Sequence, residues 1–315
     1  MNEINIITGR MNHLIDPHLT IWGWEIPVYL FLGGLTAGIL LITALTIYLG
    51  KEREFPHAAG RLSFIAPIAL SVGMGALFLD IEYKLHVFRF YTAFKITSPM
   101  SWGSWILLLV YPLSLILILG RIKISCPKLY EKLNGRGDRL IAFSEKHLHL
   151  ASAITIFVAT TLGIYTGILL SSLGARPFWN ASILGPIFLI SGLSTALALN
   201  VILAQEKHEI HFFSKYDLFM ILAEIVTVLL FVISLSSGPQ ISQESVKLIL
   251  GGDMTAIFWV FFMGFGLVAP LILEILELKG MKISKYIAPA LVLFGGLLFR
   301  FIMVEAGQLT GYIGY

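Results

Sequence analysis

Eight long apolar runs dominate the pattern of hydrophobic and polar positions along this chain. They lie near residues 24–49, 62–80, 102–120, 149–171, 183–204, 217–237, 254–277 and 287–305. Each run has close to the roughly 20 residues that an α-helix needs to cross about 30 Å of hydrocarbon. Because the runs are continuous and do not alternate, they do not resemble the strands of a β-barrel. The pattern predicts an all-α, polytopic membrane protein with eight transmembrane helices.

The overall composition supports this class. The chain is 57% hydrophobic and 13% charged, whereas soluble domains contain about 25% charged residues. A net charge of +3, spread along 315 residues, gives no reason to expect a nucleic-acid partner. The lipid bilayer is the expected surrounding.

The polar connectors indicate how the helices are directed. Connectors 1–2, 3–4, 5–6 and 7–8 carry fifteen Lys and Arg residues, and the N-terminal segment and the remaining connectors carry six. The positive-inside rule then places the first set in the cytoplasm and both termini outside. Residues 1–23 form an outer N-terminal segment, which is too polar to be a cleavable signal peptide.

An internal repeat suggests how the helices group. "PVYLFLGGLTAGIL" (27–40) aligns without gaps to "PIFLISGLSTALAL" (186–199), with six of 14 positions identical. A parallel duplication of a four-helix unit would explain the match and predicts two four-helix bundles, 24–171 and 172–315. Chance similarity between two apolar helices is the alternative.

Several polar side chains fall near the outer ends of the predicted spans. Tyr29, Asp80, Tyr165, Arg300 and Glu305 come from four different helices and lie at about the same level. Polar groups at membrane depth need a partner or a function. An aromatic-belt role is the alternative for Tyr29. Its counterpart in the repeat lacks the hydroxyl, which favours a small-molecule site in the first bundle.

Two glutamates lie deeper in the membrane. Glu224 is near the middle of the sixth run, and Glu274 is in the inner half of the seventh. A charged carboxylate is costly in hydrocarbon, so each glutamate is expected to carry a proton. One hypothesis is a proton relay from the cytoplasm through Glu274 and Glu224 to the outer site. The alternative is a neutral glutamate that hydrogen-bonds between helices.

Histidine and cysteine placement bears on cofactors. No histidine lies in the middle of a run: His147 and His149 are two residues apart, and His208 and His211 fall in a connector. A bis-histidine haem needs facing histidines within the membrane, so no haem is expected. With Cys126 as its single cysteine, the protein cannot build an iron–sulfur cluster by itself, and no metal site is expected.

Three motifs carry a resemblance to a known family. They are "WGWEIPVYLFLGGLTAG" (22–38), Asp80 followed by "SPMSWGSW" (98–105), and "YTGILLSSLGARPFWN" (165–180). They resemble the NrfD/PsrC family, the quinone-reactive membrane subunits of polysulfide-reductase-type complexes. The resemblance implies two four-helix bundles. It also implies a quinone site, with menaquinone as the expected quinone, in the first bundle near the outer surface of a bacterial or archaeal cytoplasmic membrane.

The resemblance also implies roles for particular residues. Tyr165 matches the tyrosine of the family's fourth span that holds the quinone headgroup. Where some members have an Asn and a His on the first span, this protein has Ile26 and Tyr29, which is a departure from that pattern. The residues expected at the quinone site are Tyr29, Tyr165, Arg300, His18 and Glu25, with His13 as a further candidate, and the residues expected to move protons are Asp80 and Glu224.

By resemblance, the protein is a non-catalytic subunit of a respiratory molybdopterin oxidoreductase complex. It would oxidise menaquinol for sulfur or polysulfide reduction, with proton translocation as an open question. Its implied outer partners are an iron–sulfur subunit and a molybdopterin catalytic subunit, and connector 80–101 is a candidate docking surface. Two rivals stay open: a proton- or ion-translocating transporter, and a membrane anchor without its own redox site.

Overall fold

The computed structural model describes residues 22–133, 135, 137–281 and 283–311, and all regular structure in this part is helical. Eight of its helices are long and apolar enough to cross a membrane. They are Glu25–Tyr48, His57–Asp80, Pro99–Ser125, Asp138–Ser171, Leu184–Leu203, Lys207–Ser236, Ile257–Leu278 and Ile287–Gln308. The predicted all-α, multi-pass fold class is therefore confirmed.

The elements follow one another with short connectors. Along the sequence they are α1 (Glu25–Tyr48), η1 (His57–Arg61), η2 (Leu62–Phe64), α2 (Ile65–Asp80), η3 (Lys84–His86), α3 (Arg89–Thr92), α4 (Pro99–Ser125), α5 (Pro127–Leu133), α6 (Asp138–Ser171), η4 (Pro177–Trp179), α7 (Leu184–Leu203), α8 (Lys207–Ser236), α9 (Gln240–Val246), η5 (Ile257–Val268), α10 (Ala269–Leu278) and α11 (Ile287–Gln308).

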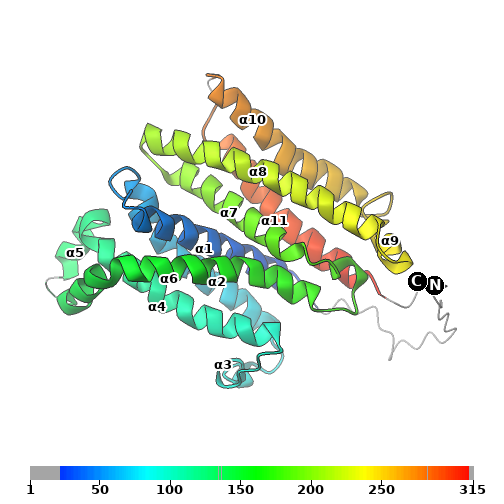
Figure 1. Cartoon of the computed structure of the whole chain (residues 1–315), viewed down its shortest axis with the longest axis horizontal. Coiled ribbons are helices and arrows are strands. Elements are labelled where there is room, and N and C mark those ends of the chain that lie inside the picture. Colours follow the sequence, from blue (N-terminus) through cyan, green and yellow to red (C-terminus); the bar gives the residue numbers. More distant parts are fainter. Residues whose placement is uncertain (1–21, 134, 136, 282, 312–315) are drawn as a thin grey trace.

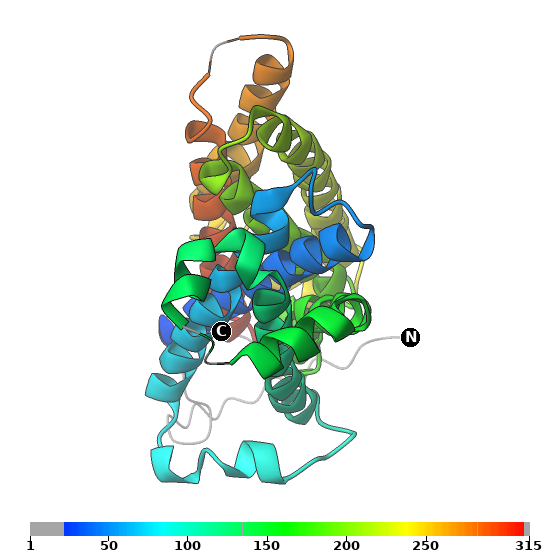
Figure 2. The same ribbon diagram turned by 90° about the vertical axis from the view of Figure 1, so that its left-hand side faces the viewer.

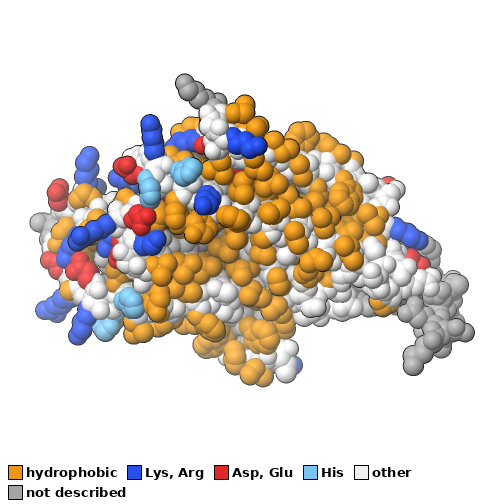
Figure 3. Space-filling view, turned by 45° about the horizontal axis from the view of Figure 1, so that its top comes forward, with side chains coloured by type: hydrophobic (Ala, Val, Ile, Leu, Met, Phe, Trp, Pro, Cys, Tyr) orange, Lys and Arg blue, Asp and Glu red, His pale blue; other side chains and the backbone are white. Residues whose placement is uncertain are grey.

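The long helices lie side by side with their axes roughly along the long dimension of the molecule (Figure 1). Charged side chains gather at the left-hand end, and hydrophobic residues cover the waist (Figure 3). We call the left-hand end the charged end and the other, where α1 begins and α11 ends, the opposite end. This division matches a protein whose waist is solvated by lipid tails.

Some helices are longer than the apolar runs that mark them. α6 begins at Asp138 and α8 at Lys207, about three turns before the runs begin. His208 and His211 therefore lie in the first turns of α8, and their expected place in a connector is wrong. Hydropathy locates only the part of a helix that lies in lipid, whereas backbone hydrogen bonding continues into polar turns.

The seventh span differs from the others in its backbone. η5 is π-helical and runs directly into α10, whose second residue is Pro270. A proline has no N–H to donate, and its ring crowds the carbonyl one turn before it. The wider π-helical turns upstream accommodate this proline without interrupting the span.

Two buried apolar clusters fill the interior. The first lies mainly among α7, α8, η5 and α11 and includes Phe231, Phe258 and Phe299. The second lies mainly among α1, α2, α4 and α6. α1 packs against α2 and α6 as well as against α7 and α11. The division into bundles 24–171 and 172–315 stays a prediction, because α1 contacts helices of both.

α1 and α7 approach each other closely where glycines meet. A Cβ on Gly38 would overlap the carbonyl oxygen of Gly192, and a Cβ on Gly192 would lie 2.6 Å from the carbonyl oxygen of Gly34. Small residues at such a crossing let two membrane helices bring their backbones together. The relative placement of the first and fifth spans depends on these glycines.

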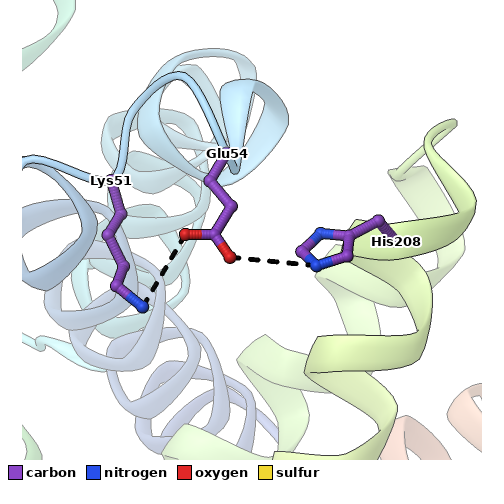
Figure 4. Close-up of polar contacts among 3 residues, drawn as sticks. All are labelled: Lys51, Glu54 and His208. Atoms are coloured by element: carbon purple, nitrogen blue, oxygen red, sulfur yellow. Dashed lines mark ion pairs between the residues drawn. The ribbon is translucent and has the colours of Figure 1, made fainter.

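A polar connection joins the helices at the charged end. Glu54, in the connector after α1, lies 3.7 Å from Lys51 Nζ and 3.8 Å from His208 Nε2 of α8 (Figure 4). These groups are exposed, so the pairs add little stability. Glu209 is fully buried and accepts hydrogen bonds from the backbone N–H groups of Ala58 (2.7 Å) and His57 (3.3 Å). The buried hydrogen bonds of Glu209 to the start of η1 therefore stabilise the fold more than the exposed ion pairs of Glu54 do.

Candidate functional site

Two tyrosines from different helices meet inside the protein. The Tyr29 hydroxyl of α1 and the Tyr165 hydroxyl of α6 lie 3.3 Å apart, and either can be the donor. Both side chains are at least 95% buried. Tyr29 belongs to the first apolar cluster and Tyr165 to the second, so the hydroxyl pair marks the seam between them. The sequence placed these residues at one level, and the tertiary structure brings them into contact.

A groove of about 520 Å³ between α4 and α6 reaches the Tyr165 side chain, whose hydroxyl contacts that of Tyr29. Its walls are mostly aromatic and aliphatic side chains, and its hydroxyl groups belong to Thr160, Thr161 and Tyr165. Trp105 and Phe157 are 41% and 72% exposed on the side of the bundle, where lipid tails would be. An apolar cleft with a few polar groups at one end is the usual form of a small-molecule site.

Gly103 of α4 makes room for the Tyr165 ring. A Cβ at position 103 would overlap the phenol ring and its hydroxyl oxygen. The glycine therefore fixes where this ring lies. The SPMSWGSW segment, which surrounds Gly103, forms the first turns of α4.

Tyr91 of α3 is a third tyrosine near the pair. Its phenol lies within electrostatic range of both Tyr29 and Tyr165. Burial, and secondarily the neighbouring Tyr111, raises the pKa of Tyr91, so the hydroxyl keeps its proton at neutral pH. The sequence suggested only that connector 80–101, which contains Tyr91, is a docking surface, because a loop sequence does not indicate which side chain packs back against the helices.

Connector 80–101 is held against α4 by its own polar contacts. Ser104 Oγ donates to the Phe90 carbonyl (2.8 Å), and Trp102 Nε1 donates to the Ile96 carbonyl (2.7 Å). The Phe94 ring meets Trp105 edge to face at a centroid distance of 5.8 Å and also lines the groove. The connector therefore forms one lip of the groove.

Two of the expected site carboxyls lie together at the opposite end. Glu25 lies at the start of α1 and Asp80 at the end of α2, and both are half-buried. They are close enough for an electrostatic interaction between the two carboxyl groups. Glu25 lies on the helix that carries Tyr29, and Asp80 lies on α2, which packs against that helix. His18 and His13, the other expected residues, lie outside the described residues.

Arg300 contacts a different part of the protein. Its guanidinium donates to Ser191 Oγ and to the carbonyl oxygen of Phe188 (3.2 Å), and it lies over the Phe188 ring. Phe188 is the repeat counterpart of Tyr29. Arg300 is 1% exposed, and it lies against Gly34 of α1. Arg300 therefore lies beside Phe188, which is the residue of the second repeat that corresponds to Tyr29 of the first.

Glu224 also lies away from the Tyr29–Tyr165 pair, among the helices of residues 172–315. It is 2% exposed on α8 and lies near Ser191 and Arg300. Sequence reasoning overlooked Asp217, one of its neighbours on the same helix, because that residue marked the edge of an apolar run. Asp217 lies seven residues before Glu224, and two residues with this spacing lie on the same face of a helix. That spacing could have indicated that Asp217 is buried beside Glu224.

Within the described ranges, no group of three or more His, Cys, Asp or Glu side chains is arranged to hold a metal ion.

Eight helices long and apolar enough to cross a membrane define the class of a multi-pass integral membrane protein. The chain belongs to the family described as polysulphide reductase, NrfD, whose model matches residues 13–312. The resemblance inferred from the three sequence motifs is therefore confirmed.

Curated relatives match along most of their length. A polysulfide reductase chain of Wolinella succinogenes is 28% identical over 307 residues, covering 91% of this protein and 94% of that relative. Protein NrfD of Escherichia coli is 29% identical over 310 residues, covering 92% and 96%. A selenate reductase subunit of Mesobacillus selenatarsenatis is 24% identical over 322 residues, covering 90% and 73%.

Proposed function

We propose that this protein is the membrane subunit of a reductase complex and that it exchanges electrons with a membrane quinone, most simply menaquinol. The observation that carries the proposal is a groove between α4 and α6 that is lined by Tyr165, whose buried hydroxyl contacts the hydroxyl of Tyr29. The names of the relatives, which belong to polysulfide and selenate reductases, support membership of such a complex.

The site fits the chemistry of a quinol. The isoprenoid tail is lipid-soluble and matches the apolar walls of the groove, and the ring oxygens match the phenol hydroxyls. Oxidation of one quinol releases two electrons and two protons. Tyr165 and Tyr29 would hydrogen-bond the ring oxygens, and the Asp80 carboxyl would accept protons at the opposite end.

The electrons would leave through an iron–sulfur partner and reach a molybdopterin subunit that reduces a sulfur or polysulfide substrate. In this proposal the charged end faces the cytoplasm and the partners bind on the other side, in a bacterial or archaeal cytoplasmic membrane. Connector 80–101 stands clear of the bundle in Figure 2 and offers a docking surface. Its exposed apolar and basic side chains include Tyr83, Lys84, Leu85, Phe88, Arg89, Lys95 and Ile96.

A photoreactive menaquinone analogue tests the assignment in the purified complex. After illumination, mass spectrometry should find the label on groove residues of α4 and α6, and excess menaquinone should prevent it. Ile106→Trp fills the groove and should reduce labelling by about tenfold. Label found only outside the groove, or unaffected by menaquinone, would contradict the proposal.

Gly103→Ala is expected to lower quinol oxidation by about 10- to 100-fold, because its methyl group displaces the Tyr165 ring and lengthens the bond to Tyr29. Quinol-dependent reduction of the partner subunit measures the rate. Gly75→Ala is the matched control, since a Cβ on Gly75 meets no atom within 4 Å. Equal rates in the two variants would show that the Tyr165 position is unimportant.

The two rival functions give different results in the same assay. A membrane anchor predicts that the groove and tyrosine variants retain full activity. A transporter without redox chemistry predicts ion movement that does not depend on quinol. Electron transfer that requires both quinol and an intact groove is expected only of the proposed function.

A further inference from the structure

A reciprocal pair of hydrogen bonds joins the end of α11 to the start of α1. The Gln308 side chain accepts from the backbone N–H of Trp22 at 2.8 Å and donates from Nε2 to the Trp22 carbonyl oxygen at 3.0 Å. The two residues are 286 positions apart in the sequence. Gln308 is 8% exposed, so water does not readily replace these bonds. One side chain therefore satisfies both backbone groups of the residue that leads into α1.

The start of α1 lacks the usual side-chain cap. Its N-cap residue, Trp24, makes no side-chain hydrogen bond to the first turn. The first backbone N–H groups of a helix have no partner within the helix, and a side-chain cap normally satisfies one of them and limits fraying. Gln308 binds the chain three residues before α1 begins at Glu25. Its hydrogen bonds therefore restrain the first turn where a cap is missing.

The RPFWN segment (176–180), which is part of one of the three sequence motifs, holds the end of α11. Arg176 Nη1 donates to the carbonyl oxygens of Gln308 and Thr310, both at 2.9 Å. The last carbonyl groups of a helix have no partner within the helix, so the guanidinium caps α11. Arg176 therefore fixes the backbone of the residue whose side chain binds Trp22.

Trp179 of the same segment holds the Trp22 ring. Its Nε1 donates to the Met303 carbonyl oxygen at 2.6 Å, and its side chain is 2% exposed. The Trp179 ring stacks on the Trp22 ring with centroids 5.3 Å apart. A Cβ on Gly307 would overlap the indole, so this glycine leaves the space that Trp179 needs. Trp22 is thus held through both its backbone and its ring.

This anchor lies close to the hydroxyl pair. Tyr29 is four residues after Glu25, in the second turn of α1, and Trp22 packs against the apolar cluster that contains Tyr29 and Trp179. The two hydroxyl oxygens of Tyr29 and Tyr165 are 3.3 Å apart, which is long for a hydroxyl hydrogen bond. A displacement of the start of α1 by a few tenths of an ångström would therefore weaken this contact.

We propose that Gln308 is a positioning residue for the quinol site. It fixes the start of α1 to the end of α11, with Arg176 and Trp179 as its supports, and thereby sets the position of the Tyr29 hydroxyl. This role rests on the proposed function, because it assigns Gln308 an effect on quinol oxidation although its side chain binds Trp22 and not the hydroxyl pair.

The first test measures quinol-dependent reduction of the partner subunit by the complete complex. Gln308→Met keeps the length of the side chain but removes both bonds to Trp22. It should lower kcat by about tenfold and change KM by less than about threefold. In a Tyr29→Phe background the same substitution should lower kcat by less than about twofold, because the hydroxyl that it displaces is already absent.

Gln243→Met is the matched control. Gln243 also donates to a backbone carbonyl, that of Gly238 at 2.9 Å, but this bond lies between α8 and α9. The variant should keep the kcat of the unmodified complex. Gly307→Ala, which displaces the Trp179 indole without altering the Gln308 side chain, is a second site variant and should lower kcat as Gln308→Met does.

Amide hydrogen exchange, followed by mass spectrometry, tests the anchor without quinol. Exchange in residues 25–29 should be about tenfold faster in Gln308→Met, whereas unchanged exchange in α4 should show that the protein stays folded. Unchanged exchange in residues 25–29, or an equal loss of kcat with and without the Tyr29 hydroxyl, overturns the proposal. Absence of quinol oxidation in the unmodified complex would overturn the proposed function, and the exchange result would still decide whether Gln308 fixes the start of α1.

Discussion

Tyr165→Phe is expected to slow quinol oxidation by about 100-fold while the protein stays folded. The substitution removes only a hydroxyl oxygen, which lies 3.3 Å from the Tyr29 hydroxyl at the end of the groove. A positioned proton donor or acceptor contributes roughly 10²–10⁴-fold to such a reaction. The measurement is quinol-dependent reduction of the partner subunit at saturating and limiting quinol, which separates turnover from binding.

Tyr111→Phe is the matched control for this prediction. Tyr111 is also a membrane tyrosine, but its hydroxyl partner is Ser71 at 3.1 Å, outside the Tyr29–Tyr165 pair. Tyr111→Phe should oxidise quinol at a rate within about twofold of the unmodified protein, because substitutions outside the binding site usually have small effects. Tyr29→Phe should resemble Tyr165→Phe. If both site variants behaved like Tyr111→Phe, the hydroxyl pair would have no part in the reaction.

Gly38→Ala is expected to lower the free energy of unfolding by about 3 kcal/mol, the upper range for overpacking. A methyl group at position 38 would overlap the carbonyl oxygen of Gly192, and it would also lie 2.6 Å from the Ala196 Cβ. Backbone atoms cannot turn away as a flexible side chain can, so α1 and α7 must separate. Denaturant unfolding of the protein in detergent measures the loss.

Gly33→Ala is the control that separates the loss of the α1–α7 contact from the general effect of replacing a helical glycine by alanine. Gly33 lies on the same helix, and a Cβ there meets no atom within 4 Å. Alanine favours the helix by up to about 1 kcal/mol over glycine, so this variant should be unchanged or slightly more stable. An equal loss in both variants would mean that the stability comes from elsewhere than the α1–α7 contact.

The candidate site was only partly predictable from the sequence. Tyr29 and Tyr165 could be assigned to one membrane level because the rise of a helix fixes depth by residue count. Arg300 was assigned to the same level, yet its side chain lies against Phe188 and Ser191. Depth follows from position along the sequence, whereas the direction of a side chain follows from helix rotation, which hydropathy does not report.

The sequence by itself determined the number of spans and the family, because hydrophobicity over about 20 residues and short motifs are local properties. Only the tertiary structure decided the contacts between helices, such as the hydroxyl pair of Tyr29 and Tyr165 and the hydrogen bond from Ser194 to Asp217. These contacts join residues far apart in the sequence. Close packing at glycines also depends on the tertiary structure: Gly103 makes room for the Tyr165 ring, and Gly38 and Gly192 let α1 and α7 bring their backbones together.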